Sequence, residues 1–250
     1  MRIAVLGGTG LIGSRVVRML TGAGHDAVPH SLSTGLNLLT EARLPEALEG
    51  AEVVVNLTRP RTFDAAASVF FRATMENLLV AAEDAGVAHV VVLSIVGVDR
   101  VPDVAYYRAK VVQEKLLTDG PVPYSIVRAT QFFEFVEPVM SWTSDEHTVR
   151  LPATPVQPIA ADDVARVVTQ VSTGEPLEEI LNIAGPEVFA LDELGRITLA
   201  ARGDHRSVET DPTAGLYAAV PGDALIAPPG AMIAATTYRE WLARPTSAER

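Results

Sequence analysis

Three glycines near the N-terminus, Gly7, Gly10 and Gly13, are spaced three residues apart. Four apolar residues precede them and an apolar-periodic segment follows, which is the order of a buried strand, a tight turn and a helix. Glycine allows unusual backbone angles and lets a ligand approach the backbone. The free N–H groups at the helix start, with the helix dipole, favour a pyrophosphate. The pattern therefore predicts a dinucleotide-binding turn, with an ordinary strand-to-helix turn as the alternative. The residues expected to contact the dinucleotide are Gly7, Thr9, Gly10, Leu11, Ile12 and Gly13.

A tyrosine and a lysine in the middle of the chain have the spacing of a proton-transfer pair. Tyr106 and Lys110 are four residues apart, so on a helix their side chains lie on one face. A lysine ammonium near a phenol lowers the pKa of the phenol, and a bound nicotinamide cation adds to this effect. Such a tyrosine can exchange a proton with a carbonyl or alcohol while hydride moves. The hydroxyl of Ser94, twelve residues earlier, can hold the substrate oxygen. The alternative is a surface Tyr/Lys pair.

The loop after the second predicted strand bears on the choice of cofactor. In a dinucleotide fold this loop faces the adenosine ribose, where an acidic residue favours NAD. No Asp or Glu occurs between Val28 and Thr40, whereas His30, Ser31 and neighbouring hydroxyls can surround a 2′-phosphate. The arginine expected beside such a phosphate is missing from this stretch. We expect NADP in preference to NAD, with a solvated polar loop as the alternative.

The order of the predicted elements defines the fold class. Buried strands at 3–6, 26–30, 52–57, 89–94 and 124–128 alternate with helices at 11–20, 63–85 and 106–117, and a short third strand is expected at 36–38. This alternation predicts an α/β protein with a Rossmann-type doubly wound parallel sheet. Because ligands meet the carboxyl ends of such strands, Asn56, Leu57 and Thr58 are expected near the cofactor.

The C-terminal half has a looser pattern. Gln131 to Phe135 is rich in aromatic residues and is expected either to pack a small lobe or to line a substrate pocket. Edge strands are expected within 149–159, a helix at 164–171 with Asp162 as its N-cap, a strand at 180–183, and helices at 191–201 and 238–242. We expect one NAD(P)-binding domain over 1–250, with a core at about 1–130 and a small substrate lobe formed mainly from 131–250.

Composition narrows the possible functions. The 250 residues are 48% hydrophobic and 20% charged, as expected for a globular protein. A net charge of −11 opposes binding to nucleic acid or anionic membranes. The chain has no cysteine, and its five scattered histidines lack metal-ligand spacing, so no metal site is expected. No apolar run approaches the length of a membrane span and no signal peptide is evident, which favours a cytoplasmic protein.

Together, the glycine turn, Ser94 and Tyr106-x-x-x-Lys110 resemble the short-chain dehydrogenase/reductase superfamily. The runs 93–99, 106–110 and 128–132 look like its extended and atypical branches, most closely the NmrA-like, NAD(P)H-binding members. The resemblance covers about residues 1–185. It implies a Rossmann fold with a C-terminal substrate lobe, Tyr106 as the catalytic acid/base, Ser94 as its helper and Lys110 on the nicotinamide ribose.

Three functions are compatible with this resemblance. The first is an oxidoreductase that moves hydride from NADPH to a small carbonyl or quinone-like substrate. The second is a non-catalytic NADP(H)-binding redox sensor that regulates partners, since atypical members can lose reductase activity. The third is an NAD-dependent epimerase or dehydratase of the sugar type. A small-molecule substrate is the expected partner, and the protein is expected to be a monomer or a homodimer.

Overall fold

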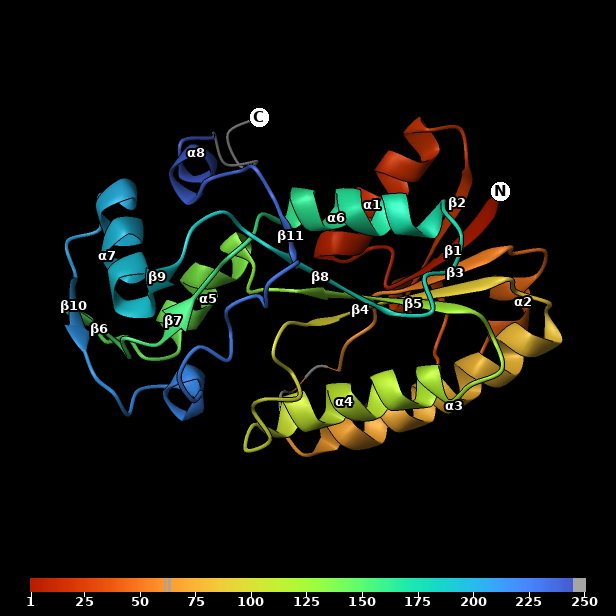
Figure 1. Ribbon diagram of the computed structural model, residues 1–250, viewed down its shortest axis with the longest axis horizontal. Helices are drawn as coiled ribbons and strands as arrows, with labels where there is room; N and C mark the ends of the chain where they lie inside the picture. Colours follow the sequence, from red (N-terminus) through yellow and green to blue (C-terminus); the bar gives the residue numbers. More distant parts are fainter. Residues whose placement is uncertain (61, 63, 245–250) are drawn as a thin grey trace. The chain divides into compact units, whose positions relative to one another are not determined.

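The computed structural model describes residues 1–60, 62 and 64–244 of the chain (Figure 1). Packing divides it into two compact units, which are described separately. The first consists of Met1–Arg128 and Val164–Leu181, and the second of Ala129–Asp163 and the described part of Asn182–Arg250. The segment 164–181 thus groups with the N-terminal core.

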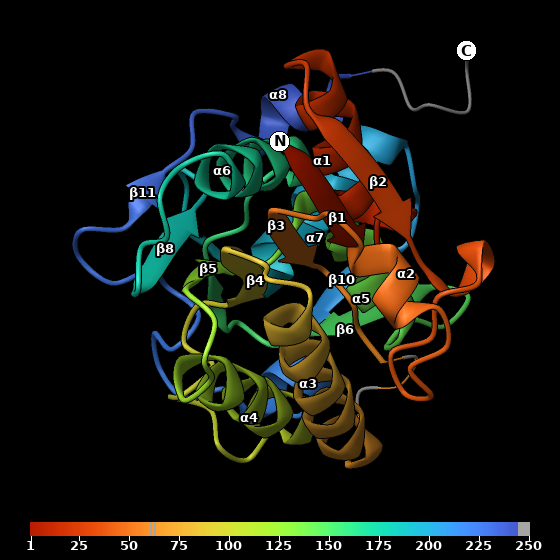
Figure 2. The ribbon, with the colours of Figure 1, turned by 90° about the vertical axis from the view of Figure 1, so that its right-hand side faces the viewer.

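A seven-stranded parallel sheet has the strand order β11-β8-β5-β4-β3-β1-β2. Its strands are β1 (Arg2–Leu6), β2 (Asp26–His30), β3 (Val53–Asn56), β4 (His89–Ile95), β5 (Tyr124–Ala129), β8 (Ile180–Ala184) and β11 (Met232–Ile233). Figure 2 shows β2, β1, β3, β4 and β5 side by side. The chain runs from β1 to β2 at one edge and then returns to β3 on the other side of β1. The strand order therefore reverses between β1 and β3, the place where doubly wound folds bind ligands.

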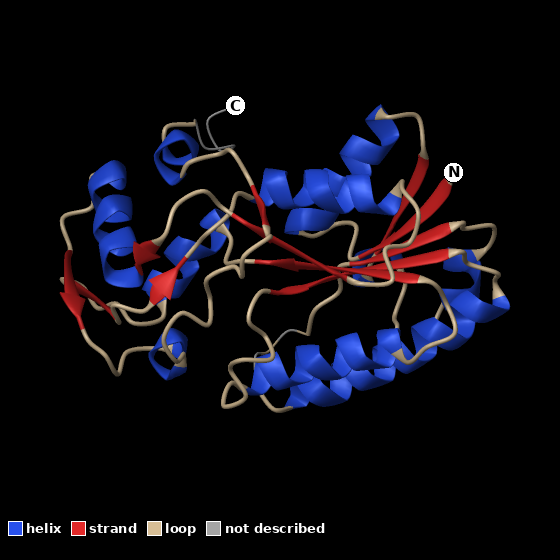
Figure 3. Ribbon diagram, viewed as in Figure 1, coloured by secondary structure: helices blue, strands red, loops and turns tan. Residues whose placement is uncertain are grey.

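Helices cover both faces of this sheet. They are α1 (Leu11–Gly22), α2 (Leu44–Leu48), α3 (Ala66–Asp84), α4 (Ala105–Thr118) and α6 (Ala161–Ser172). Helices α3 and α4 pack side by side on one face, and α1 and α6 lie on the other (Figure 3). Because both faces are covered, β3 and β4 have continuous apolar runs with buried valines at 53–55 and 90–92. The predicted doubly wound class is confirmed, although the predicted start of α3 at Phe63 lies outside the described residues.

The second unit is built of short elements. They are η2 (Phe133–Phe135), α5 (Val136–Ser141), β6 (Thr148–Leu151), β7 (Pro155–Val156), β9 (Phe189–Ala190), α7 (Leu191–Arg202), β10 (Ser207–Thr210), η3 (Leu216–Ala219) and α8 (Tyr238–Leu242). An aromatic cluster holds α8 in place, since the Phe133 ring lies 4.9 Å from that of Tyr238 and 5.7 Å from that of Trp241. Phe133, in the aromatic run after β5, therefore packs this unit.

Two local predictions are wrong. Residues 36–38 do not form a strand; Asn37 makes a single bridge to Ala42, while Leu36 and Leu38 are buried. Helix α6 begins at Ala161, so Asp162 lies in its first turn and does not cap it. The Ala161 N–H instead donates to the carboxylate of Glu134, at 3.1 and 3.3 Å. A partner 27 residues away in the chain thus replaces the local cap that the sequence suggested.

Candidate functional site

The glycine turn joins the carboxyl end of β1 to α1. Gly7 has a φ of +79°, a conformation that a side chain would strain. Its N–H donates to the His30 carbonyl at 2.8 Å, and the Gly10 N–H donates to the Gly7 carbonyl at 2.9 Å. These bonds fold the turn tightly against the end of β2.

The turn has no room for side chains at several positions. A Cβ at Gly13 would lie 2.2 Å from the Gly7 carbonyl oxygen, and one at Gly7 would lie 2.9 Å from the Leu57 carbonyl oxygen. Gly8 was not singled out from the sequence, yet a Cβ there would lie 2.7 Å from both the Pro29 Cα and the Val5 carbonyl oxygen. Gly7, Gly8 and Gly13 are therefore required by the close approach of the turn to α1 and to the ends of β2 and β3, whereas a Cβ at Gly10 would lie 3.3 Å from the Gly7 carbonyl oxygen.

The start of α1 offers unpaired backbone donors. The first bond of the helix ladder runs from the Ser14 N–H to the Gly10 carbonyl, so the N–H groups of Leu11, Ile12 and Gly13 precede the ladder. The first turn of α1 contains no acidic residue, and Leu11 is 42% exposed. This cradle fits an anionic diphosphate, because the helix dipole and the free N–H groups act together without a competing carboxylate.

The end of β3 lies against this turn. The Leu57 N–H donates to the Leu6 carbonyl at 2.9 Å. Asn56 is 1% exposed, and its side-chain oxygen accepts the Thr58 N–H at 3.1 Å and the Thr58 hydroxyl at 2.7 Å. Asn56 therefore shapes the loop from within, whereas Leu57 and Thr58 are partly exposed.

Arg43 reaches the loop 30–34 that ends β2 and is expected to face the adenosine ribose, which is called the ribose loop below. The Arg43 guanidinium lies 3.4 Å from the Thr34 carbonyl oxygen, and a Cβ at Gly35 would lie 3.1 Å from one of its nitrogens. Nearby, the hydroxyls of Ser31 and Ser33 are 2.7 Å apart. Burial, with the charges of Arg2 and Arg43, lowers the pKa of His30. The stretch 28–40 itself has no arginine, and the 35–43 turn brings the Arg43 guanidinium back to the loop.

Lys110 is buried between α4, α3 and β4. It is 4% exposed, and its ammonium donates to the Leu93 carbonyl at 2.6 Å and to the Gln113 side-chain oxygen. The Phe71 ring centroid lies 4.9 Å from Nζ. Burial lowers the pKa of Lys110 to about 7, with Glu114 acting in the opposite direction.

Tyr106 lies on the same helix, against α3. Its ring is 5.8 Å from that of Phe71 and belongs to a small apolar cluster with Ala109. Burial raises the pKa of Tyr106 to about 12, and the charge that opposes this rise comes from Arg59. The expectation that Lys110 lowers the pKa of this phenol is therefore wrong in this structure. Burial dominates and raises that pKa, and the charge that partly offsets the rise is that of Arg59.

Ser94 lies near the carboxyl end of β4, the strand that leads to α4. It is 3% exposed, and its Oγ is buried without a hydrogen-bond partner among the described residues. Such an unsatisfied buried hydroxyl is unusual and calls for an explanation. It is consistent with a hydroxyl reserved for a ligand.

Residues 7–174 match the model of an NAD(P)H-binding family. The protein belongs to this NAD(P)H-binding family. The match spans the glycine turn, the ribose loop, Ser94, Tyr106 and Lys110. The predicted NAD(P)H-binding family is confirmed, whereas membership of the short-chain dehydrogenase/reductase superfamily and of its NmrA-like branch stays a prediction.

Similar proteins include a reductase, a protein solved with a UDP-sugar and NAD, and an assembly factor. Over 240 residues the chain is 24% identical to the photosystem II assembly factor Ycf39 of Synechocystis, covering 86% of this chain and 72% of that protein. MoeE5, solved with UDP-glucuronic acid and NAD, shares the fold with a TM-score of 0.73 at 17% identity, covering 97% of each chain. The dTDP-4-dehydrorhamnose reductase of Bacillus anthracis, solved with NADP, has a TM-score of 0.70 at 14% identity, covering 87% of this chain and 88% of that one.

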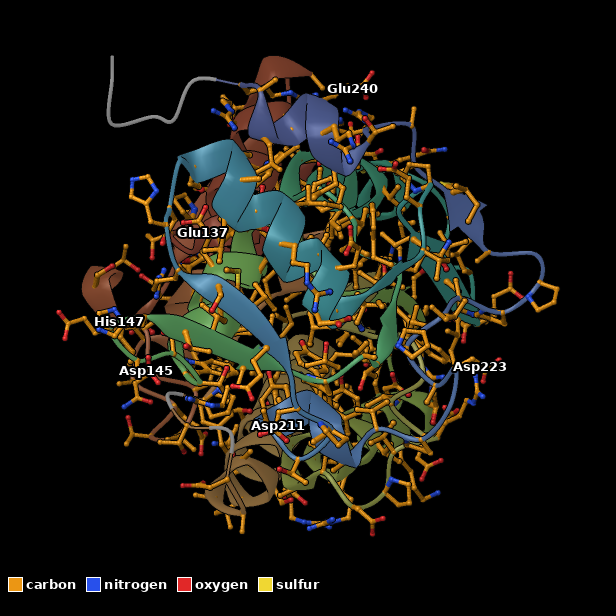
Figure 4. The ribbon with its side chains drawn as sticks, turned by 90° about the vertical axis from the view of Figure 1, so that its left-hand side faces the viewer. Glu137, Asp145, His147, Asp211, Asp223 and Glu240 are labelled. Carbon is orange, nitrogen blue, oxygen red and sulfur yellow. The ribbon has the colours of Figure 1, made fainter. Side chains whose placement is uncertain are left out.

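The second unit has several acidic side chains at its surface. Figure 4 shows Glu137, Asp145, His147, Asp211, Asp223 and Glu240 spread over this unit. Across the part of the chain that the structure describes, no group of three or more acidic, His or Cys side chains is placed to hold a metal ion.

None of the helices in the described residues is long and apolar enough for a transmembrane segment.

Proposed function

We propose that this protein is an NADP(H)-dependent oxidoreductase that reduces a small carbonyl or quinone-like compound. One observation carries the proposal: the elements β4 and α4, which bear Ser94, Tyr106 and Lys110, belong to the same compact unit as a glycine turn shaped for a diphosphate. Bound NADPH would supply the hydride. The protein's own residues must then orient the substrate oxygen and provide a proton.

Tyr106 is the proposed proton donor. Its raised pKa keeps the phenol protonated at neutral pH, as a donor must be. The positive charge of Arg59 lowers the cost of forming the phenolate. Ser94 is proposed to hold the substrate oxygen with its unpaired hydroxyl, and Lys110 to contact the nicotinamide ribose.

The ribose loop supports a preference for NADP. Arg43 and the hydroxyls of Ser31 and Ser33 offer one positive charge and polar hydrogens, which suit a 2′-phosphate. The charge of the same arginine contributes to the lowered pKa of His30. NAD lacks this phosphate, so it would form no ion pair with the Arg43 guanidinium.

Two other functions remain candidates because specific observations favour them. The likeness to Ycf39, named as an assembly factor, favours a non-catalytic NADP(H)-binding regulator. The likeness to MoeE5, solved with a UDP-sugar and NAD, favours an epimerase or dehydratase. A regulator would bind cofactor without turnover across a carbonyl panel, and an epimerase would retain tightly bound NAD through purification.

A thermal-shift titration with NADPH, NADH, NADP and NAD tests the cofactor assignment. At 100 times its dissociation constant a ligand stabilises the fold by about 2.7 kcal/mol, which a melting curve resolves. NADPH is expected to give the larger shift. Arg43→Ala should weaken NADPH binding by about tenfold and leave NADH binding unchanged, whereas Arg72→Ala, on the exposed face of α3, should change neither. Equal shifts with NADPH and NADH would contradict the NADP preference.

Tyr106→Phe tests the catalytic assignment. Removal of the phenolic hydroxyl should lower turnover by about 10²- to 10⁴-fold and leave the dissociation constant for NADPH within about twofold. Turnover is followed by loss of NADPH absorbance with a panel of aldehydes, ketones and quinones. Unchanged turnover in the variant would remove Tyr106 from the mechanism.

A further inference from the structure

The buried ammonium of Lys110 has three N–H donors, and the described structure assigns acceptors to two of them. One is the Leu93 carbonyl on β4 and the other is the side-chain oxygen of Gln113, one turn further along α4. Two fixed bonds determine the direction of the third N–H. The ammonium is thus held in one orientation before any ligand arrives.

Gln113 is unusual for a helical glutamine. Its exposed fraction is 0%, and its side-chain Nε2 is buried without a hydrogen-bond partner among the described residues. A buried amide whose NH2 group has no hydrogen-bond partner lowers the free energy of unfolding of the protein. An apolar side chain at this position would avoid that loss. An explanation for a glutamine here must therefore lie in what its oxygen does.

The other groups around Lys110 cannot replace that oxygen. Phe71, on α3, contributes an aromatic face at 4.9 Å but no lone pair. Glu114, the charged neighbour on α4, accepts two hydrogen bonds from the Arg128 side chain on β5, at 2.9 and 2.6 Å. The Tyr106 phenol is uncharged at neutral pH. Gln113 is therefore the side-chain acceptor that the described structure gives to the Lys110 ammonium.

We propose that Gln113 is a positioning residue for Lys110: its side-chain oxygen favours the charged form of the lysine and, together with the Leu93 carbonyl, fixes the orientation of the ammonium. The proposal rests on the proposed function for what Lys110 contacts, but not for the hydrogen bond itself. Its role can be measured in the protein without any cofactor.

The composition of the chain makes that measurement direct. Lys110 and Lys115 are the two lysines of the sequence, so ¹³Cε-lysine labelling gives two NMR signals that Lys115→Arg assigns. Lys115 is exposed, with its side chain 73% accessible, and serves as an internal reference. A pH titration then reports the midpoint for Lys110 alone.

Gln113→Leu removes the acceptor and keeps a similar volume. Because a hydrogen bond to the charged form favours that form, the Lys110 midpoint should fall by about one pH unit, while the Lys115 midpoint stays fixed. Gln113→Glu should raise the midpoint, since a carboxylate adds an opposite charge. An unchanged Lys110 midpoint in either folded variant overturns the proposal.

Thr74→Val is the matched control. Thr74 is also fully buried, on the neighbouring helix α3, and its hydroxyl donates to the Phe70 carbonyl at 2.8 Å. The variant should lower the melting temperature without moving the Lys110 midpoint. If it moves that midpoint as far as Gln113→Leu does, the effect is general loosening and the proposal fails.

Cofactor binding separates this proposal from the proposed function. With Gln113→Leu, NADPH binding should weaken by about tenfold at pH 7.5, and Gln113→Glu should restore much of it. Unchanged affinity in Gln113→Leu overturns the positioning role of the glutamine. If the unmodified protein binds no NADPH, the proposed function fails, and the NMR titration still decides whether Gln113 holds Lys110.

Discussion

At the scale of single residues, the glycine turn combines two physical demands. Gly7 needs a positive φ, whereas Gly13 needs the absence of a side chain because α1 crosses the turn so closely. Both demands follow from one arrangement, in which the backbone itself forms the surface proposed to bind the diphosphate. The residues of the turn are therefore less replaceable than their exposure suggests.

Gly13→Ala should show this demand directly. Its Cβ would lie 2.2 Å from the Gly7 carbonyl oxygen, so the turn must shift, at a cost of about 1–3 kcal/mol in the free energy of unfolding. NADPH binding should be lost with it. Urea unfolding and cofactor titration measure the two effects.

Gly22→Ala is the matched control for that substitution. A Cβ at Gly22, also in α1, would meet nothing within 4 Å, and alanine favours a helix. This variant should be as stable as the unmodified protein or more so. Equal losses for Gly13→Ala and Gly22→Ala would contradict the steric argument.

At the scale of elements, a buried ion pair ties β5 to α4. Arg128 and Glu114 make two hydrogen bonds, at 2.9 and 2.6 Å, with side chains 11% and 7% exposed. Arg128 also contacts Asp99, whose side chain is 55% exposed. The pair fixes the helix that carries Tyr106 and Lys110 relative to the sheet.

Glu114→Ala and Asp99→Ala should therefore differ greatly. Loss of Glu114 leaves the Arg128 charge buried without its main partner and should lower the free energy of unfolding by about 3–5 kcal/mol. Loss of the exposed Asp99 should lower it by less than about 1 kcal/mol. Chemical denaturation of both variants checks the ranking, and similar losses would argue against a structural role for the buried pair.

At the scale of the whole molecule, a buried histidine makes stability depend on pH. His89 is 2% exposed, its Nε2 lies 2.8 Å from the Ser125 hydroxyl, and burial lowers its pKa from 6.5 to about 4. In the unfolded chain this histidine becomes protonated as the pH falls below 6.5. In the folded protein it stays neutral until the pH reaches about 4. Stability from the neutral histidine is thus complete above pH 6.5 and is lost as pH falls toward 4.

The expected loss from His89 is on the order of 3 kcal/mol in the free energy of unfolding between pH 6.5 and 4. His89→Gln keeps a polar side chain but does not titrate, so its stability should fall less over this range. Urea unfolding of both proteins at pH 7.5, 5.5 and 4.5 tests this. Parallel pH dependences would assign the acid sensitivity to other groups, among them His30, whose pKa is also lowered.

The sequence by itself determined the alternation of strands and helices, the glycine turn and the Tyr-x-x-x-Lys pair. These features depend on local periodicity and on residues close in the chain, so the core strands, the helices beside them and the doubly wound class were predictable. The same locality explains the failures at 36–38 and at Asp162. At Asp162 a contact from 27 residues away decided the outcome, because Glu134 accepts the Ala161 N–H. At 36–38 a tight turn, in which Asn37 bridges to Ala42, took the place of the strand.

Only the tertiary structure decided the electrostatics of the candidate site. Burial, which depends on every element packed around a side chain, raises the pKa of Tyr106 and lowers that of Lys110, where the spacing alone suggested a lysine acting on the phenol. Folding also brings Arg43 to the ribose loop and the Gln113 oxygen to Lys110. Local spacing identifies which residues can act, but desolvation and long-range charge determine their protonation, and both arise only when the chain is packed.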